Sequence, residues 1–83
     1  MSIQSELKNL FHPNIIRQSK RLEPERVDAL AVNEAAGALL RLKGKPTEQG
    51  ALVKTMQPST AAALCRWLLD PAFWHLVGGI TRQ

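Results

Sequence analysis

Cys65 and His75 are the two residues whose types could supply a catalytic nucleophile and a general base. Cys65 lies in the apolar run AAALCRWLL, which is typical of a buried and unreactive thiol, and the chain offers no obvious third group to orient His75. One Cys and two distant His residues give no recognisable metal-ligand spacing. We therefore expect no catalytic pair and no metal site, and we interpret His12 as a helix cap or a surface residue.

The acidic residues also favour structural roles over catalytic ones. Glu23, Glu25 and Asp28 gather where a helix is expected to begin, and negative charge stabilises that end of a helix. Asp70 precedes Pro71 and is expected to cap a final helical turn. The chain contains neither a Walker loop nor a dinucleotide-binding fingerprint. The sequence thus predicts a protein that is not an enzyme and needs no cofactor.

Basic residues outnumber acidic ones by eleven to seven, which gives a net charge of +4, and they fall into two groups. Such groups can meet phosphates or an acidic partner, although most charge runs are solvated surface. The first group contains Arg17, Lys20, Arg21 and Arg26, and the second contains Arg41, Lys43 and Lys45.

The C-terminal part of the chain concentrates its aromatic side chains. Three of the four aromatic residues fall within eight positions, next to Arg66. Aromatic residues with an adjacent Arg are frequent in protein interfaces, but a small protein also builds its core from its largest side chains. These residues can therefore form the core alone or the core and an interface, and two tryptophans this close are hard to bury fully in one small protomer. The candidate partner-binding residues are Arg66, Trp67, Phe73, Trp74, Arg17, Lys20 and Arg21.

The segment from Leu22 to Gly44 carries the fullest set of helix signals in the chain. Pro24 suits the first helical position, Arg41 and Lys43 suit the last turn, and Gly44 suits a left-handed residue after the helix. Apolar residues cover more than half of the circumference of this helix, so neighbours should cover at least two of its sides. We therefore predict a long central helix over about residues 24–43.

Other helices are expected on both sides of this one. The sequence predicts helices over 3–11, 48–57, 59–69 and 71–77, with Thr47 and either Ser59 or Thr60 as caps and Gly78 and Gly79 as the final stop. Residues 13–20 form either a short helix or a loop packed by two isoleucines. No segment alternates with period two over strand length. The predicted fold class is all-α: one domain over residues 1–83, a small helical bundle of four to six helices around the long central helix.

Residues 32–56 have the rhythm of a helix, a glycine-containing turn and a second helix. Within them, the residues Asn33 to Ala36 followed by Leu39 and Leu40 resemble the first helix of excisionase-type winged-helix domains. That resemblance implies DNA binding through the second helix. This helix offers only Gln49 and Lys54 for contacts to base edges.

The single Cys excludes an intramolecular disulfide and fits a reducing compartment. The first residues do not resemble a secretory signal, and no run approaches about 20 apolar residues, so we expect a cytoplasmic protein without a membrane partner. The predicted function is that of a small non-enzymatic regulator or inhibitor, a homodimer that occludes a surface of a partner protein. The alternative is a DNA- or RNA-binding transcriptional regulator with a helix-turn-helix-like core.

Overall fold

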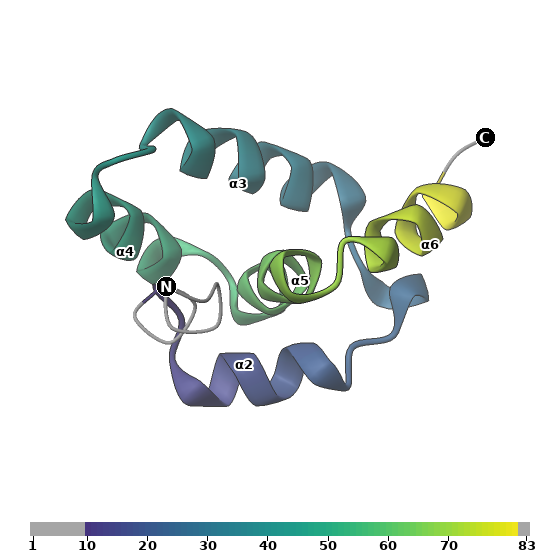
Figure 1. The fold of residues 1–83 in the computed structure, drawn as a ribbon. Coiled ribbons are helices and arrows are strands. Elements are labelled where there is room, and N and C mark those ends of the chain that lie inside the picture. The colour runs from purple at the N-terminus through teal and green to yellow at the C-terminus, as the bar shows by residue number, and fades with distance from the viewer. Residues whose placement is uncertain (1–9, 82–83) are drawn as a thin grey trace.

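The regular elements of the chain are helices joined by short turns, and most of them begin at a proline. The computed structural model describes residues 10–81, with side chains up to Val77. Every regular element in this range is a helix, which confirms the predicted all-α class (Figure 1). These elements are α2 (Pro13–Lys20), the 3-10 turn η1 (Pro24–Arg26), α3 (Ala29–Arg41), α4 (Pro46–Thr55), α5 (Pro58–Leu69) and α6 (Ala72–Thr81).

The starts of the helices reflect both prolines and caps. Residues 13–20 form a helix and not a loop, and the Nδ1 atom of His12 accepts a hydrogen bond of 3.0 Å from the Asn14 N–H. The cap interpretation of His12 is therefore confirmed. The predicted caps of α4 and α5 are wrong: Lys45 and Gln57 hold the N-cap positions, because a proline with its preset φ takes the first helical position after each.

The predicted helix over 24–43 is shorter than expected. Pro24 begins only the three-residue turn η1, and Val27 is extended, with φ −87° and ψ 128°. The Asp28 side chain then accepts a hydrogen bond of 3.2 Å from the Ala31 N–H, so α3 begins at Ala29. The break after η1 turns Val27 inward, where it is buried against α6 and α5. Burial of Val27 and the Asp28 cap together outweigh the helix signals at Pro24.

The helix at the centre of the fold is α5, and not the predicted segment 24–43. In Figure 1, α5 lies between α3 on one side and α2 on the other. Ala61 to Cys65 are all buried, whereas α3 buries only Val32, Ala36 and Leu39. The small side chains of α5 allow neighbouring helices to pack on it from several directions. Segment 24–43 has a broader apolar face, but its outer leucines remain exposed to solvent.

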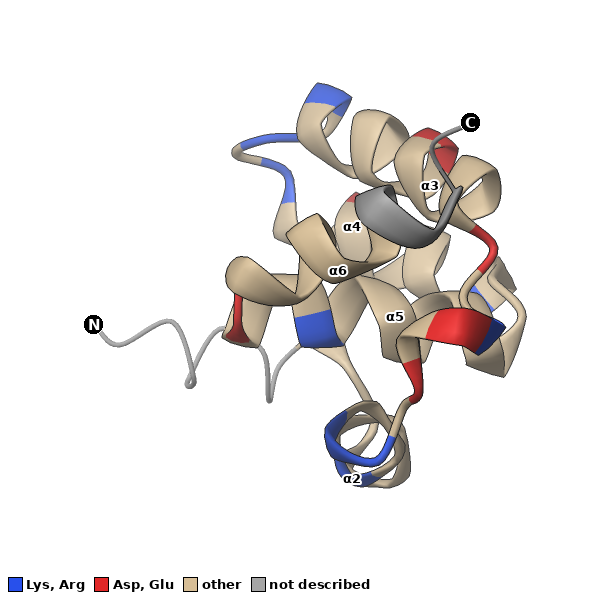
Figure 2. Ribbon diagram, turned by 90° about the vertical axis from the view of Figure 1, so that its right-hand side faces the viewer, with Lys and Arg blue, Asp and Glu red and all other residues tan. Residues whose placement is uncertain are grey.

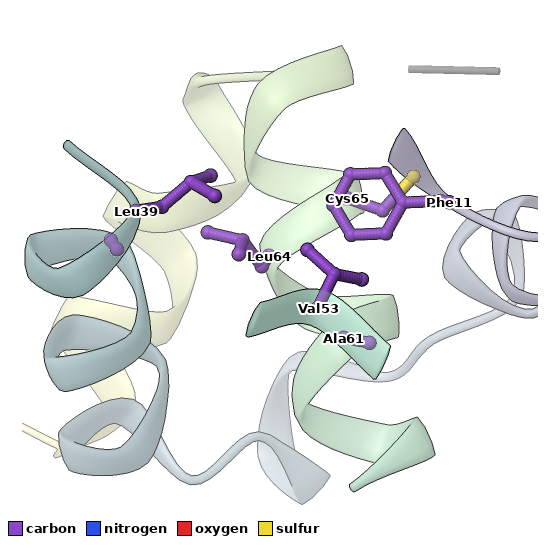
Figure 3. Packing of buried hydrophobic residues seen from close by; sticks show 7 residues of the cluster. Phe11, Leu39, Val53, Ala61, Leu64 and Cys65 are labelled. Atoms are coloured by element: carbon purple, nitrogen blue, oxygen red, sulfur yellow. The ribbon is translucent and has the colours of Figure 1, made fainter. Parts of the chain in front are cut away.

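Two clusters of buried side chains meet on α5. The first cluster joins α3, α4, α5 and Phe11 around Leu64, with the Phe11 ring beside Cys65 (Figure 3). The second cluster joins the end of η1 to α3, α5 and α6. Its buried members are Val27, Val32, Ala63, Phe73 and Val77.

The two ends of the chain differ from prediction in different ways. The helix predicted over 3–11 lies almost entirely outside the described residues. At the other end, α6 does not stop at Gly78 and Gly79 but continues to Thr81. A glycine stops a helix when it turns left-handed; within the described residues, only Gly44 has a positive φ, of 84°. No helix of residues 10–81 is both long enough and apolar enough to cross a membrane.

Replacement of Leu39 by Ala tests the packing of α3 on α5. Leu39 is 8% exposed and lies in the first cluster (Figure 3), so Leu39→Ala should lower the free energy of unfolding by about 2–4 kcal/mol through loss of burial and a residual cavity. Urea denaturation measures this loss. Leu76→Ala is the control, because Leu76 is 59% exposed, and it should change stability by less than about 0.5 kcal/mol. Equal effects of the two variants would contradict the packing.

Candidate partner-binding surface

The first basic group lies along the exposed face of α2 and, with Arg26, reaches η1. Ile15, Ile16 and Ser19 turn toward α5, and the Ser19 hydroxyl, which is fully buried, donates a hydrogen bond of 2.6 Å to the Ile16 carbonyl. At helical spacing, this leaves Asn14, Arg17, Gln18 and Arg21 on the outer face. An open groove of about 510 Å³ runs along this face and reaches η1. Its lining residues are Asn14, Arg17, Gln18, Arg21, Leu22, Glu23 and Arg26.

The groove is positively charged because three guanidinium groups face one carboxylate. Arg17 donates a hydrogen bond to the Oδ1 atom of Asn14, which orients its guanidinium along the helix. Arg26 forms an ion pair of 3.5 Å with Glu23, and both side chains are well exposed, so this contact is weak. Guanidinium groups present paired N–H donors that match carboxylates and phosphates. The groove can therefore bind an anionic group of either kind.

Arg66 is used inside the fold. Its Nη1 atom donates hydrogen bonds of 3.1 Å to the Lys20 carbonyl and 3.5 Å to the Ser19 carbonyl, at the C-terminal end of α2. Its guanidinium carbon lies 5.1 Å from the centre of the Phe73 ring, and Nη2 lies 3.8 Å from the Asp70 carboxylate. A cation at this position stabilises the negative end of α2. Arg66 thus joins α2 to α5 and α6, and it positions the groove rather than lining it.

The structure brings the predicted aromatic residues together but exposes them unequally. Phe73 is 2% exposed and belongs to the second core cluster, so its side chain does not reach the surface. Trp67 and Trp74 are half-buried, with ring centres 5.5 Å apart and planes tilted by 35°. Trp67 packs on the first cluster and Trp74 on the second. The tryptophan pair therefore connects the two clusters and keeps part of its surface accessible.

Three predicted partner-binding residues, Arg17, Lys20 and Arg21, are exposed on α2 and at its C-terminal end. Asn14 and Gln18, which were not predicted, complete the polar lining of the groove. The signal was the spacing of residues 14, 17, 18 and 21, which share one face of a helix. That signal depends on residues 13–20 being helical, and the sequence alone is equally compatible with a loop there.

The second basic group lies far from the groove. In Figure 2, the blue segments of α2 and those that follow α3 are at opposite ends of the molecule, with α5 between them. Within the second group, Lys45 pairs with Glu48 at 3.8 Å, and both side chains are exposed. The two groups do not form one continuous basic surface. A single ligand therefore contacts only one of them unless it spans the whole molecule.

The turn between α3 and α4 contains Gly44, which has a positive φ of 84°. The Gln49 side chain, however, donates a hydrogen bond of 3.3 Å to the Leu39 carbonyl at the end of α3. Gln49 therefore stabilises the turn and does not extend away from α4. Of the two polar side chains that the sequence offered for base contacts, Lys54 is left exposed.

Cys65 has the environment of a structural thiol. It is fully buried, and burial raises its pKa, although a hydrogen bond with Ser19 and the charge of Lys20 act in the opposite direction. His75 is exposed on α6. Between residues 10 and 81, no group of three or more His, Cys, Asp or Glu side chains could hold a metal ion.

The groove of α2 is therefore the candidate site, and Arg66 holds the helix that carries it. Comparison of the chain with protein-family models, curated proteins and solved structures found no match. The function is therefore inferred from the charge, shape and exposure of these residues.

Removal of the Arg66 charge tests its role as a link between helices. Arg66→Met keeps most of the side-chain volume but loses the hydrogen bonds to α2, so we expect a loss of about 1–2 kcal/mol in the free energy of unfolding. Chemical denaturation provides the measurement. Lys54→Met, at an exposed position of α4, should cost less than about 0.5 kcal/mol. If Arg66→Met leaves the free energy of unfolding unchanged, this side chain is not needed to hold α2 on α5.

Proposed function

We propose that this protein is a small non-enzymatic regulator or inhibitor that binds an acidic surface of a partner protein and occludes it, acting as a homodimer in the cytoplasm. The observation that carries the proposal is the groove of α2, in which three guanidinium groups surround an open space with a single carboxylate. The unpaired Cys65 thiol is consistent with a reducing compartment.

The groove suits carboxylates on a folded or extended protein segment. Arg17, Arg21 and Arg26 offer forked donors from two neighbouring elements, so acidic side chains spaced along a segment could each meet one guanidinium. Leu22 adds an apolar contact to the same lining. Such a surface attracts an acidic partner before contact and holds it by charge-assisted hydrogen bonds afterwards. Binding along α2 would exclude other molecules from the partner's acidic surface.

The alternative function is that of a DNA- or RNA-binding regulator. The connection between α3 and α4 favours this alternative, because its glycine turn joins two helices as in a helix-turn-helix. Two observations weigh against it. Gln49 is engaged in the turn, and the basic groove lies on α2, at the opposite end of the molecule from the residues after α3 (Figure 2). We therefore favour a protein as the partner.

A capture experiment with two charge-reversed variants tests the proposal. The double variant Arg17→Glu with Arg21→Glu should lose proteins that the unmodified chain retains from a lysate of the source organism, because repulsion replaces attraction in the groove. The matched control, Lys45→Glu with Lys54→Glu, changes the net charge equally on α4 and should retain them. Quantitative mass spectrometry of the retained proteins provides the readout.

The same experiment separates the two functions. Retention that survives nuclease treatment and is lost only in the α2 variant supports a protein partner. Retention that disappears with nuclease, together with binding to a mixed-sequence DNA duplex that falls steeply with salt, contradicts the proposal and supports the nucleic-acid alternative.

A further inference from the structure

The outer face of α3 carries two large leucines that the fold of one chain leaves uncovered, together with the exposed polar residues Asn33 and Glu34. Leu30 is 76% exposed and Leu40 is 66% exposed, and they are two of the three large hydrophobic residues that are exposed among the described residues. The opposite face of α3 packs on α5 through Val32, Ala36 and Leu39. In Figure 1, α3 forms one edge of the molecule, and its outer side faces away from α5.

The residues of this face are arranged symmetrically about the middle of the helix. Leu30, Asn33, Gly37 and Leu40 follow one another at intervals of three, four and three residues, so they form one strip along α3. The four positions are symmetric about Ala35, with Leu30 and Leu40 at the two ends and with Asn33 on one side and Gly37 on the other. If a second copy of α3 packs against it in the antiparallel direction, Leu30 of each copy meets Leu40 of the other, and Asn33 of each copy meets Gly37 of the other.

Gly37 is not required by the fold of a single chain. A Cβ atom at this position would meet no other atom within 4 Å, and the φ of Gly37 is not positive. Glycine lowers the stability of a helix interior relative to alanine, so its presence here lacks an explanation within one chain. A glycine in the middle of a helix face allows the backbone of another helix to come close. In an antiparallel pair, the backbone of each copy can approach Gly37 of the other copy.

The charges at the two ends of α3 select the same arrangement. Glu25 and Asp28 precede the helix, whereas Arg41 and Lys43 lie at its other end, and all four are exposed. An antiparallel pair places the acidic end of each copy beside the basic end of the other, and it also aligns the two helix dipoles favourably. A parallel pair would place like charges together. The surface is therefore complementary to itself in one direction only.

We propose that the outer face of α3 is the interface of a two-fold symmetric, antiparallel homodimer, with Leu30, Asn33, Gly37 and Leu40 at its centre. This deepens the homodimer of the proposed function and rests on that part of it alone. Because α2 lies on the other side of α5 from α3 (Figure 1), the dimer would present two arginine grooves facing outward. Two linked grooves bind a partner with repeated acidic sites more tightly than one groove does.

Sedimentation equilibrium of substituted chains tests the interface. The unmodified chain should be a dimer, and Leu40→Glu should weaken dimerisation by about 100-fold or more, because the substitution buries a carboxylate at two equivalent positions. Gly37→Leu should also give a monomer that remains folded by circular dichroism, because a Cβ atom at this position meets no other atom within 4 Å in the single chain. The matched control, Leu76→Glu, changes an exposed leucine of α6 and should remain dimeric. An unmodified chain that stays monomeric up to about 1 mM, or a dimer that Leu40→Glu leaves intact, would overturn the proposal.

Cross-linking tests the antiparallel direction. Chains with Leu30→Cys and chains with Leu40→Cys should form disulfides when they are mixed, and neither should do so alone. Cross-linking of each variant with itself would indicate a parallel pair and would overturn the arrangement. The Arg17→Glu and Arg21→Glu double variant should remain a dimer, so failure of partner capture and failure of dimerisation are observed separately.

Discussion

Complete burial of a short alanine-rich stretch in α5 is the constraint on which the rest of the structure depends. Ala61 to Cys65 are each at most 3% exposed, although together they include both faces of a helix. A helix that is apolar all around its circumference is stable only when other elements cover it. The chain achieves this with helices α2 and α3 on opposite sides and with α6 and Phe11 at further positions. The small side chains make this close packing possible.

This arrangement determines which surfaces remain free. Because α2 and α3 each use one face to cover α5, each keeps an outer face that the fold does not need. The outer face of α2 carries guanidinium groups, and that of α3 carries two leucines and a glycine. These faces differ in chemistry and point in opposite directions, so one can bind an acidic partner while the other binds a second copy. Arg66 holds α2 on α5 through its hydrogen bonds to the C-terminal carbonyls of α2.

The sequence was sufficient to predict the fold class and most helices, because prolines, caps and helical spacing act locally. It was not sufficient to choose between two competing helix starts. Pro24 and Asp28 are both suited to the start of a helix. The burial of Val27 against helices that are distant in sequence decides between them. The identity of the central helix was missed for a similar reason. Residues 24–43 have more apolar positions than α5, but burial depends on which helix the others surround.

The candidate site also combines features that the sequence predicts with features that depend on tertiary contacts. Exposure of Arg17, Lys20 and Arg21 follows from helical spacing once α2 is known to be a helix. The role of Arg66 could not be predicted, because its hydrogen-bond acceptors are carbonyls 46 and 47 residues earlier in the chain. Phe73 illustrates the limit of composition: an aromatic residue beside an arginine fits an interface or a core, and here the arginine packs on a buried ring.

Native-state hydrogen exchange of the backbone amides, followed by NMR, tests most directly whether α5 is the centre of the fold. Amides of buried central helices exchange only on global unfolding, whereas interruptions between elements exchange through local opening. The slowest exchange should fall within residues 62–69 of α5, and the amide of the exposed Asp28, between η1 and α3, should exchange fast. Uninterrupted slow exchange from residue 25 to residue 42, with faster exchange in α5, would contradict this account.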